Sequence, residues 1–181
     1  MRLAGWRLLV PWRAGRVIEL MNRKELHFTV FGRPVPQGSK NVYRGRLVEA
    51  SKDLKPWRAA IAHEVFTTWT KTGDERPFTD PVVIRATFIL PRPKTVKRLL
   101  PSVPPDLDKL QRALGDALSI DSQALIDDSF IVGWRSTKIY ASDPADAGVR
   151  VSIRAVDLDL SDGSPASIEE LVNKAFENGP F

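Results

Sequence analysis

Apolar residues alternate with polar ones in several short segments, and this period of two predicts β-strands. Residues 26–31 (LHFTVF) and 149–156 alternate in this way, which is typical of strands with one buried face. Residues 82–90 are almost continuously apolar, so we expect a central strand covered on both faces. Residues 130–139 predict one further strand. Three or more strands with an apolar face can form a stable sheet, so a small sheet is expected.

Spacings of three and four residues predict three helices. The first covers about residues 53–71, with Ser51 as a candidate N-cap and a buried stripe of Leu54, Trp57, Ile61, Val65 and Trp69. We interpret the two Trp side chains as core residues, not as platforms for base stacking. The second helix follows a Pro-rich loop, and its apolar face consists of Leu107, Leu110, Leu114, Ala117 and Leu118. The third runs to about Phe176 after a capping box of Ser167 and Glu170.

The segments between these elements predict loops and a hairpin. A Pro/Gly loop over residues 32–39 leads into a basic hairpin over residues 40–48, which turns at Arg44-Gly45. Residues 94–105 are basic and rich in Pro, and we expect an irregular, mobile approach to the second helix. Together the elements predict an α+β fold, with a small mixed or antiparallel sheet and helices packed on it.

Shifts in composition divide the chain into three parts. We expect a basic N-terminal extension over residues 1–20, one domain over 21–157, and an acidic C-terminal tail with a short helix over 158–181. Met21 is a candidate for the natural start of translation, because a more ordinary sequence follows it. A basic arm that binds nucleic acid is the alternative interpretation of the extension.

The composition excludes several classes of protein. The hydrophobic content of 43% and the charged content of 27% are ordinary for a soluble globular domain. Cys is absent, which excludes disulfides and thiolate metal sites, and two His residues argue against a His-rich zinc centre. Near the N-terminus, the apolar run Leu8–Val10 is far too short for a signal peptide or a membrane span. The absence of Cys suits a reducing compartment, and we expect a cytoplasmic protein.

Charge is distributed unevenly along the chain. Residues 1–58 carry 13 Lys and Arg against four Asp and Glu, whereas residues 106–147 carry four against eight. A basic half joined to an acidic cluster suggests that one part holds an anionic polymer and the other performs metal-dependent chemistry. The alternative is ordinary solvated charge on the surface of a globular domain.

The acidic cluster lies within residues 104–130 (PPDLDKLQRALGDALSIDSQALIDDSF) and holds six of the 22 acidic residues. Carboxylates at this density raise one another's pKa unless a cation neutralises them, and Mg²⁺ or Mn²⁺ suits such ligands. Asp106 and Asp108 flank a loop-to-helix bend, where both can converge on one ion, and Asp128 can approach from the next element. Arg112, one turn after Asp108, could neutralise charge on a scissile phosphate. We therefore predict a metal site for phosphodiester hydrolysis.

Structural interpretations of the same residues remain open. Asp106 is also a suitable helix N-cap. Arg112 could form plain surface pairs with Asp108 and Asp116 at spacings of four, each contributing roughly 0.2–0.5 kcal/mol. Asp127-Asp128 could be turn residues. An EF-hand does not fit, because the fifth and sixth positions of its loop would be Leu and Gln. A phosphatase-type nucleophile does not fit either, because Pro residues precede the motif.

Two basic segments are candidates for contact with the DNA backbone. The hairpin and the Pro-rich loop supply the predicted DNA-binding residues, which are Lys40, Asn41, Tyr43, Arg44, Arg46, Arg92, Lys94, Lys97 and Arg98. A solvated hairpin is the alternative for the first of these segments. Phosphate contacts of this kind would make affinity fall steeply with salt.

Two stretches, PDLDKLQRALGDAL (105–118) and LIDDSFIVGWRSTKI (125–139), resemble the RusA family of Holliday junction resolvases, which is common in phages. The similarity extends in order and spacing from about Glu25 to Ala155. It implies a small α+β subunit that forms a homodimer and binds four-way DNA junctions. It further implies paired Mg²⁺-dependent nicks during DNA recombination and repair.

By position, the resemblance places the family's acidic trio on Asp106, Asp108 and Asp128. The family's catalytic Lys falls on Arg112, which keeps the positive charge but cannot transfer a proton. Asp116 and Asp127 match family positions with supporting roles. The sequence thus predicts a structure-selective endonuclease. The alternatives are a non-catalytic module that binds DNA junctions, and a Mg²⁺-dependent nuclease acting on other branched replication or packaging intermediates.

Overall fold

A computed structural model describes residues 25–38, 40–43, 46–49, 51–73, 77–156 and 168–177. Its elements are β1 (Glu25–Phe31), β2 (Lys40–Tyr43), β3 (Arg46–Glu49), α1 (Leu54–Thr72), β4 (Val82–Leu90), α2 (Leu107–Asp116), a π-helical turn η1 (Ala117–Asp121), the 3₁₀ turns η2 (Asp128–Phe130) and η3 (Pro144–Asp146), β5 (Ile131–Tyr140), β6 (Gly148–Ala155) and α3 (Ile168–Glu177). Three earlier expectations lie outside the described residues: the extension 1–20, the hairpin turn at Arg44-Gly45, and the capping role of Ser167.

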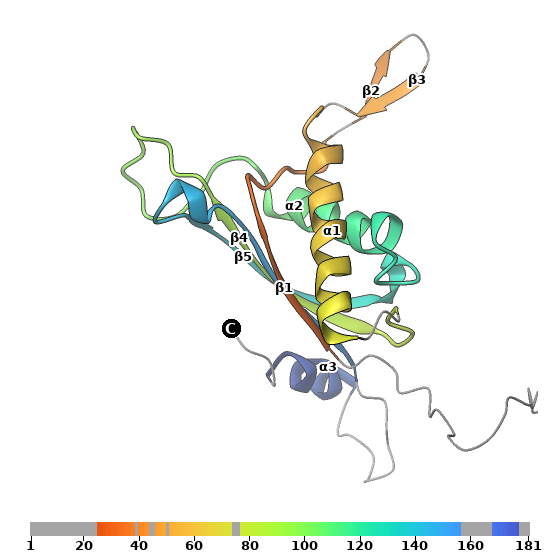
Figure 1. Cartoon of the computed structure of the whole chain (residues 1–181). Coiled ribbons are helices and arrows are strands. Elements are labelled where there is room, and N and C mark those ends of the chain that lie inside the picture. The colour runs from red at the N-terminus through yellow and green to blue at the C-terminus, as the bar shows by residue number, and fades with distance from the viewer. Residues whose placement is uncertain are drawn as a thin grey trace, which may run out of the picture.

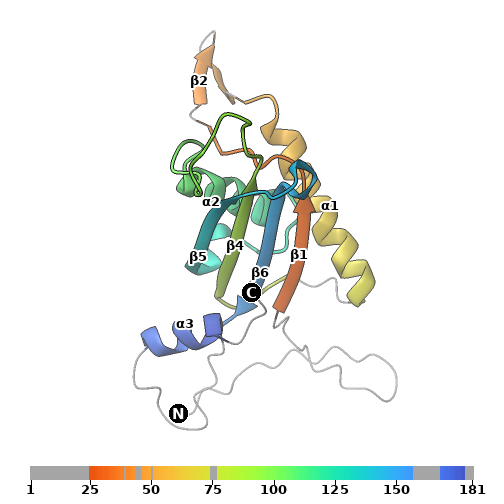
Figure 2. The same ribbon diagram turned by 90° about the vertical axis from the view of Figure 1, so that its left-hand side faces the viewer.

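A four-stranded sheet of order β1-β6-β4-β5 forms the centre of the molecule (Figure 2). Strand β4 pairs in parallel with β5 and antiparallel with β6, and β1 closes the other edge against β6. The predicted central strand is confirmed, because β4 has a neighbour on each side. The expected hairpin is also confirmed, since β2 pairs antiparallel with β3 and projects from one end of the sheet (Figure 1). The fold is α+β with a mixed sheet, as the sequence predicts.

Helices α1 and α2 cover one face of this sheet (Figures 1 and 2). The whole predicted stripe of α1 is buried, and both Trp side chains belong to the core. The expected N-cap is wrong, because α1 begins after Asp53 and only the backbone oxygen of Ser51 bonds to its first turn. Gly73 ends the helix in the left-handed conformation with φ of 67°, which costs glycine little.

Strands β1 and β6 approach very closely at Gly148. A Cβ atom at this position would lie 2.1 Å from the backbone oxygen of Val30. Such a separation is far below van der Waals contact, so the edge pairing depends on glycine here.

Helix α3 packs on the opposite face of the sheet, close to the start of β5. Phe176 is buried against Gly133, and the Arg135 guanidinium lies 4.5 Å from its ring centroid. Arg85 donates a hydrogen bond to the backbone oxygen of Phe176. Leu171 and Val172 complete a small apolar cluster. The helix of the C-terminal tail therefore packs on the sheet of the domain.

Candidate active site

Helix α2 separates two kinds of side chain. Leu110 and Leu114 are buried in the core, so the helix turns a different face toward solvent. That face carries Asp108, Arg112 and Asp116 at spacings of four. The predicted alignment of these three residues is confirmed, because all of them line one pocket.

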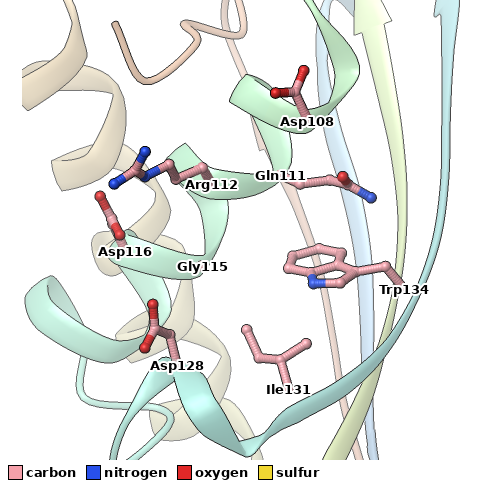
Figure 3. A pocket seen from close by; sticks show the side chains of 8 residues that line it. All are labelled: Asp108, Gln111, Arg112, Gly115, Asp116, Asp128, Ile131 and Trp134. Carbon is pink, nitrogen blue, oxygen red and sulfur yellow. The ribbon is translucent and has the colours of Figure 1, made fainter. Parts of the chain in front are cut away.

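The pocket has a volume of about 280 Å³ and opens between α2 and the start of β5 (Figure 3). Its lining combines charged and apolar groups, which are Asp108, Gln111, Arg112, Gly115, Asp116, Asp128, Ile131 and Trp134. Arg112 extends toward Asp116, while the carboxylate of Asp108 points away from Arg112 (Figure 3). Asp128 approaches from η2, an element 20 positions later in the chain than Asp108. The structure thus brings two of the three predicted acidic ligands, and the predicted Arg, to one opening.

Asp106 lies outside this lining. It occupies the N-cap position of α2 without a side-chain capping bond, and its carboxylate pairs with Lys109 at 3.0 Å. The hydrogen bond and negative charge of Asp106 raise the pKa of Lys109 above its usual value. Asp106 remains exposed, so a change of rotamer would release it from this pair.

Asp116 is the most enclosed carboxylate of the pocket. Burial raises its pKa above the usual value of 3.8, and the charges of Asp128 and Asp121 act in the same direction. The guanidinium groups of Arg58 and Arg112 oppose this rise. Burial is thus the main reason why ionising Asp116 is costly, and the nearby acidic groups add to this cost.

Arg58 on α1 joins the first helix to the acidic segment. Its Nε atom lies 2.5 Å from Oδ2 of Asp121, and one terminal nitrogen lies 3.4 Å from Oδ2 of Asp116. The other terminal nitrogen donates to the backbone oxygen of Asp116 at 3.4 Å. A single guanidinium therefore holds the end of α2 and the π-helical turn against α1.

The two adjacent acidic residues before β5 have different environments. Asp127 accepts a hydrogen bond from the backbone N–H of Ser129 at 2.9 Å, and hydrogen bonding with Ser129 lowers the pKa of its carboxyl. The structural interpretation as a turn residue therefore holds for Asp127. Asp128 instead lines the pocket.

The side chains of the site are of the type that binds a divalent ion, but they are not close enough together in the structure to hold one. Carboxylate oxygens are the ligands that Mg²⁺ prefers. Within the described ranges, however, no three His, Cys, Asp or Glu side chains lie close enough together to hold one ion. The ligand set of Asp106, Asp108 and Asp128 therefore stays a prediction.

The predicted DNA-binding residues fall into two groups. The structure traces β2 and β3 but does not describe side chains there, so the roles of Lys40, Asn41, Tyr43, Arg44 and Arg46 stay predictions. In the loop after β4, Lys94, Lys97 and Arg98 are exposed. Arg92 differs, because its guanidinium donates to the backbone oxygens of Val96, Lys97 and Arg98 at 3.2, 3.3 and 3.0 Å. The Arg92 side chain therefore stabilises the conformation of the loop.

Sequence reasoning missed several residues of this region. Gln111 and Trp134 line the pocket, Arg58 holds its acidic wall, and Lys138 supports the approach to α2. Nζ of Lys138 donates to the backbone oxygens of Val103 and Pro105, each at 2.9 Å. The position of Arg58 beside the buried stripe of α1 was an available signal. Bonds to loop carbonyls leave no periodic signal in a sequence.

The pocket thus combines three carboxylates with one guanidinium, and an exposed basic loop precedes the helix that carries most of them. The model of the family Endodeoxyribonuclease RusA matches residues 32–154, more than half of the 181 residues. The chain belongs to the RusA family of endodeoxyribonucleases, which confirms the resemblance. A search of the curated proteins finds no match. No helix in the described part of the chain is long and apolar enough to cross a membrane.

Proposed function

We propose that this protein is a Mg²⁺-dependent resolvase that cuts four-way DNA junctions by paired nicks during recombination and repair in the cytoplasm. Membership of the family supports the general activity, which is endonucleolytic cleavage of DNA. The observation that supports the finer proposal is the pocket of about 280 Å³, which is lined by Asp108, Asp116 and Asp128 together with Arg112.

Each charged group of the pocket has a task in this proposal. Asp108 and Asp128, with Asp106 after it leaves Lys109, hold the metal. A bound Mg²⁺ supplies Lewis-acid polarisation of the phosphoryl oxygen and a lower pKa for the attacking water. Arg112 binds the scissile phosphate and offsets the negative charge that develops on it, without any proton transfer.

A homodimer completes the proposal. A four-way junction is nearly two-fold symmetric, and paired nicks require two equivalent sites related by the same symmetry. Two copies of one pocket supply these sites. The exposed basic side chains of Lys94, Lys97 and Arg98 bind phosphates of the DNA backbone around each site. The affinity for DNA is therefore expected to depend on salt.

A panel of labelled DNA substrates tests the activity. Four-way, three-way and linear DNA are incubated with the full chain, with and without Mg²⁺, and products are resolved on denaturing gels. We expect paired nicks in the four-way junction that require the metal. Preferential cutting of three-way DNA would instead support a nuclease for other branched intermediates, and sedimentation of the free protein would reveal a monomer if the dimer is wrong.

One further observation favours a second candidate, a junction-binding module without catalysis. Arg stands at position 112 where the family has Lys, and Asp106 is paired with Lys109 instead of lining the pocket. Junction binding without cleavage under any divalent metal would favour this candidate.

A further inference from the structure

The loop between β4 and α2, residues 91–105, presents an apolar pair to solvent. Leu99 is 84% exposed and Leu100 is 64% exposed, the first being the most exposed of the large apolar side chains that the structure describes. The loop projects from the end of the sheet where α2 begins, and the ribbon of the hairpin β2–β3 lies at the same end (Figures 1 and 2). Two neighbouring exposed Leu residues are costly in water, so a partner is expected to cover them.

This loop is a built structure although it contains no helix or strand. The Arg92 guanidinium binds three successive backbone oxygens and lies 5.7 Å from the ring centroid of Tyr140. The N–H of Ser102 donates to the backbone oxygen of Leu100 at 2.9 Å, directly beyond the apolar pair. Lys138 binds two carbonyls at the far end. The apolar pair is therefore held outward, and less conformational entropy is lost when a partner binds it.

The charges around the pair indicate what the partner is. Lys94, Lys97 and Arg98 are exposed on the same loop, and no acidic residue lies between positions 91 and 105. A partner that covers the apolar pair therefore also meets Lys and Arg side chains, which favours an anionic partner. DNA fits this surface, because its phosphates can pair with the Lys and Arg side chains of the loop. The faces of its nucleobases are apolar and can contact the two Leu side chains.

Resting on the proposed function, we propose that Leu99 and Leu100 form a wedge that enters the branch point of the DNA and packs against the base faces at the ends of the arms. Apolar wedges that unstack base steps are a general device of DNA-bending proteins, at a cost of a few kcal/mol per step. At a branch point the base stack is already interrupted, so this cost is smaller than in duplex DNA. The loop leads directly into α2, whose Asp108 and Arg112 line the pocket, so the wedge would position the strand that crosses the pocket.

Fluorescence of 2-aminopurine placed beside the branch point tests the wedge, because unstacking raises its emission. The full chain is titrated with the junction in EDTA, which separates binding from cleavage, and with a second junction that carries the probe within an arm. We expect a rise at the branch point only. The variant Leu99→Ala/Leu100→Ala should lose this rise and bind the junction about tenfold more weakly, with unchanged affinity for linear duplex. Both side chains are exposed, so folding should not change.

Matched variants sharpen the test. Ile120→Ala removes an apolar side chain that is 65% exposed and does not line the pocket, and it should behave as wild type. Arg92→Lys keeps the charge but cannot bridge three carbonyls, so it should reduce the fluorescence rise. A junction complex without any rise would overturn the wedge, as would a double variant that binds like wild type or changes the oligomeric state. A protein that raises the fluorescence but cuts nothing would keep the wedge and refute the nuclease.

Discussion

Replacing Arg58 by Met removes the charge that joins α1 to the acidic wall of the pocket while keeping a side chain of similar length. The change leaves the carboxylates of Asp116 and Asp121 without their partner on α1. Removing one member of a buried ion pair costs about 3–5 kcal/mol, whereas an exposed pair contributes about 0–1 kcal/mol. The side chain of Arg58 is 15% exposed, and those of Asp116 and Asp121 are 17% and 33% exposed. This intermediate burial places the expected loss of unfolding free energy at about 2 kcal/mol.

A loss of that size lowers the Tm of a chain of this length by about 4–8 °C, which thermal unfolding at neutral pH measures. A double-mutant cycle with Asp116→Asn isolates the pair. We expect Arg58→Met to cost about 1 kcal/mol less in the Asp116→Asn background, because the buried charge is then absent. Arg150→Met, at an exposed position on β6, is the control and should stay within about 0.5 kcal/mol of wild type. An Arg58→Met protein as stable as the control, or an equal cost in both backgrounds, would refute this reasoning.

Three further predictions concern stability and its dependence on pH. Lys138→Met should lower the unfolding free energy by roughly 1–2 kcal/mol and the Tm by a few degrees, because two backbone carbonyls before α2 lose a charged hydrogen-bond donor. The same change should slow DNA cleavage, and a cleavage rate equal to that of wild type would contradict this positioning role. Gly148→Ala should destabilise the protein by more than about 2 kcal/mol, because the new Cβ would collide with the backbone oxygen of Val30 at the β1–β6 edge. Urea unfolding measures this loss, and a neutral effect would mean that the edge can shift. Because the pKa of Asp116 is raised in the folded state, its contribution to stability is greatest below pH 3.8 and is lost as the pH rises through the folded-state pKa. The variant Asp116→Asn should therefore gain stability relative to wild type between acidic and neutral pH. A stability difference that does not change with pH would contradict the raised pKa.

Local periodicity accounts for the part of the fold that the sequence predicts well. The alternation over residues 149–156 and the continuous apolar run over residues 82–90 arise because sheet burial repeats every two residues or covers both faces, and both segments are strands. Helix ends are less well predicted, since Ser51 and Asp53 are both residue types that suit an N-cap, and the structure has Asp53 at that position. The docking of α3 was open, because an amphipathic helix does not reveal which surface covers its apolar stripe.

The site shows the same division between local and long-range information. The spacing of Asp108, Arg112 and Asp116 on one helix predicts a shared face, and the pocket contains all three. The ion pairs of Arg58 join residues about 60 positions apart, a distance at which no periodic pattern operates. Asp106 was expected beside Asp108, but its pair with Lys109, a choice of exposed side-chain rotamer, turns it from the pocket.

Single-turnover cleavage of a labelled four-way junction by Asp108→Asn, beside wild type, tests the central claim most directly. The substitution removes a pocket carboxylate from an exposed helical position, so folding and junction affinity should stay near wild type. Asp146→Asn, an exposed acidic position outside the pocket, is the matched control. We expect Asp108→Asn to lose Mg²⁺-dependent nicking by at least about a hundredfold while the control cuts normally. Cleavage by Asp108→Asn at the wild-type rate would contradict the assignment of this pocket as the active site.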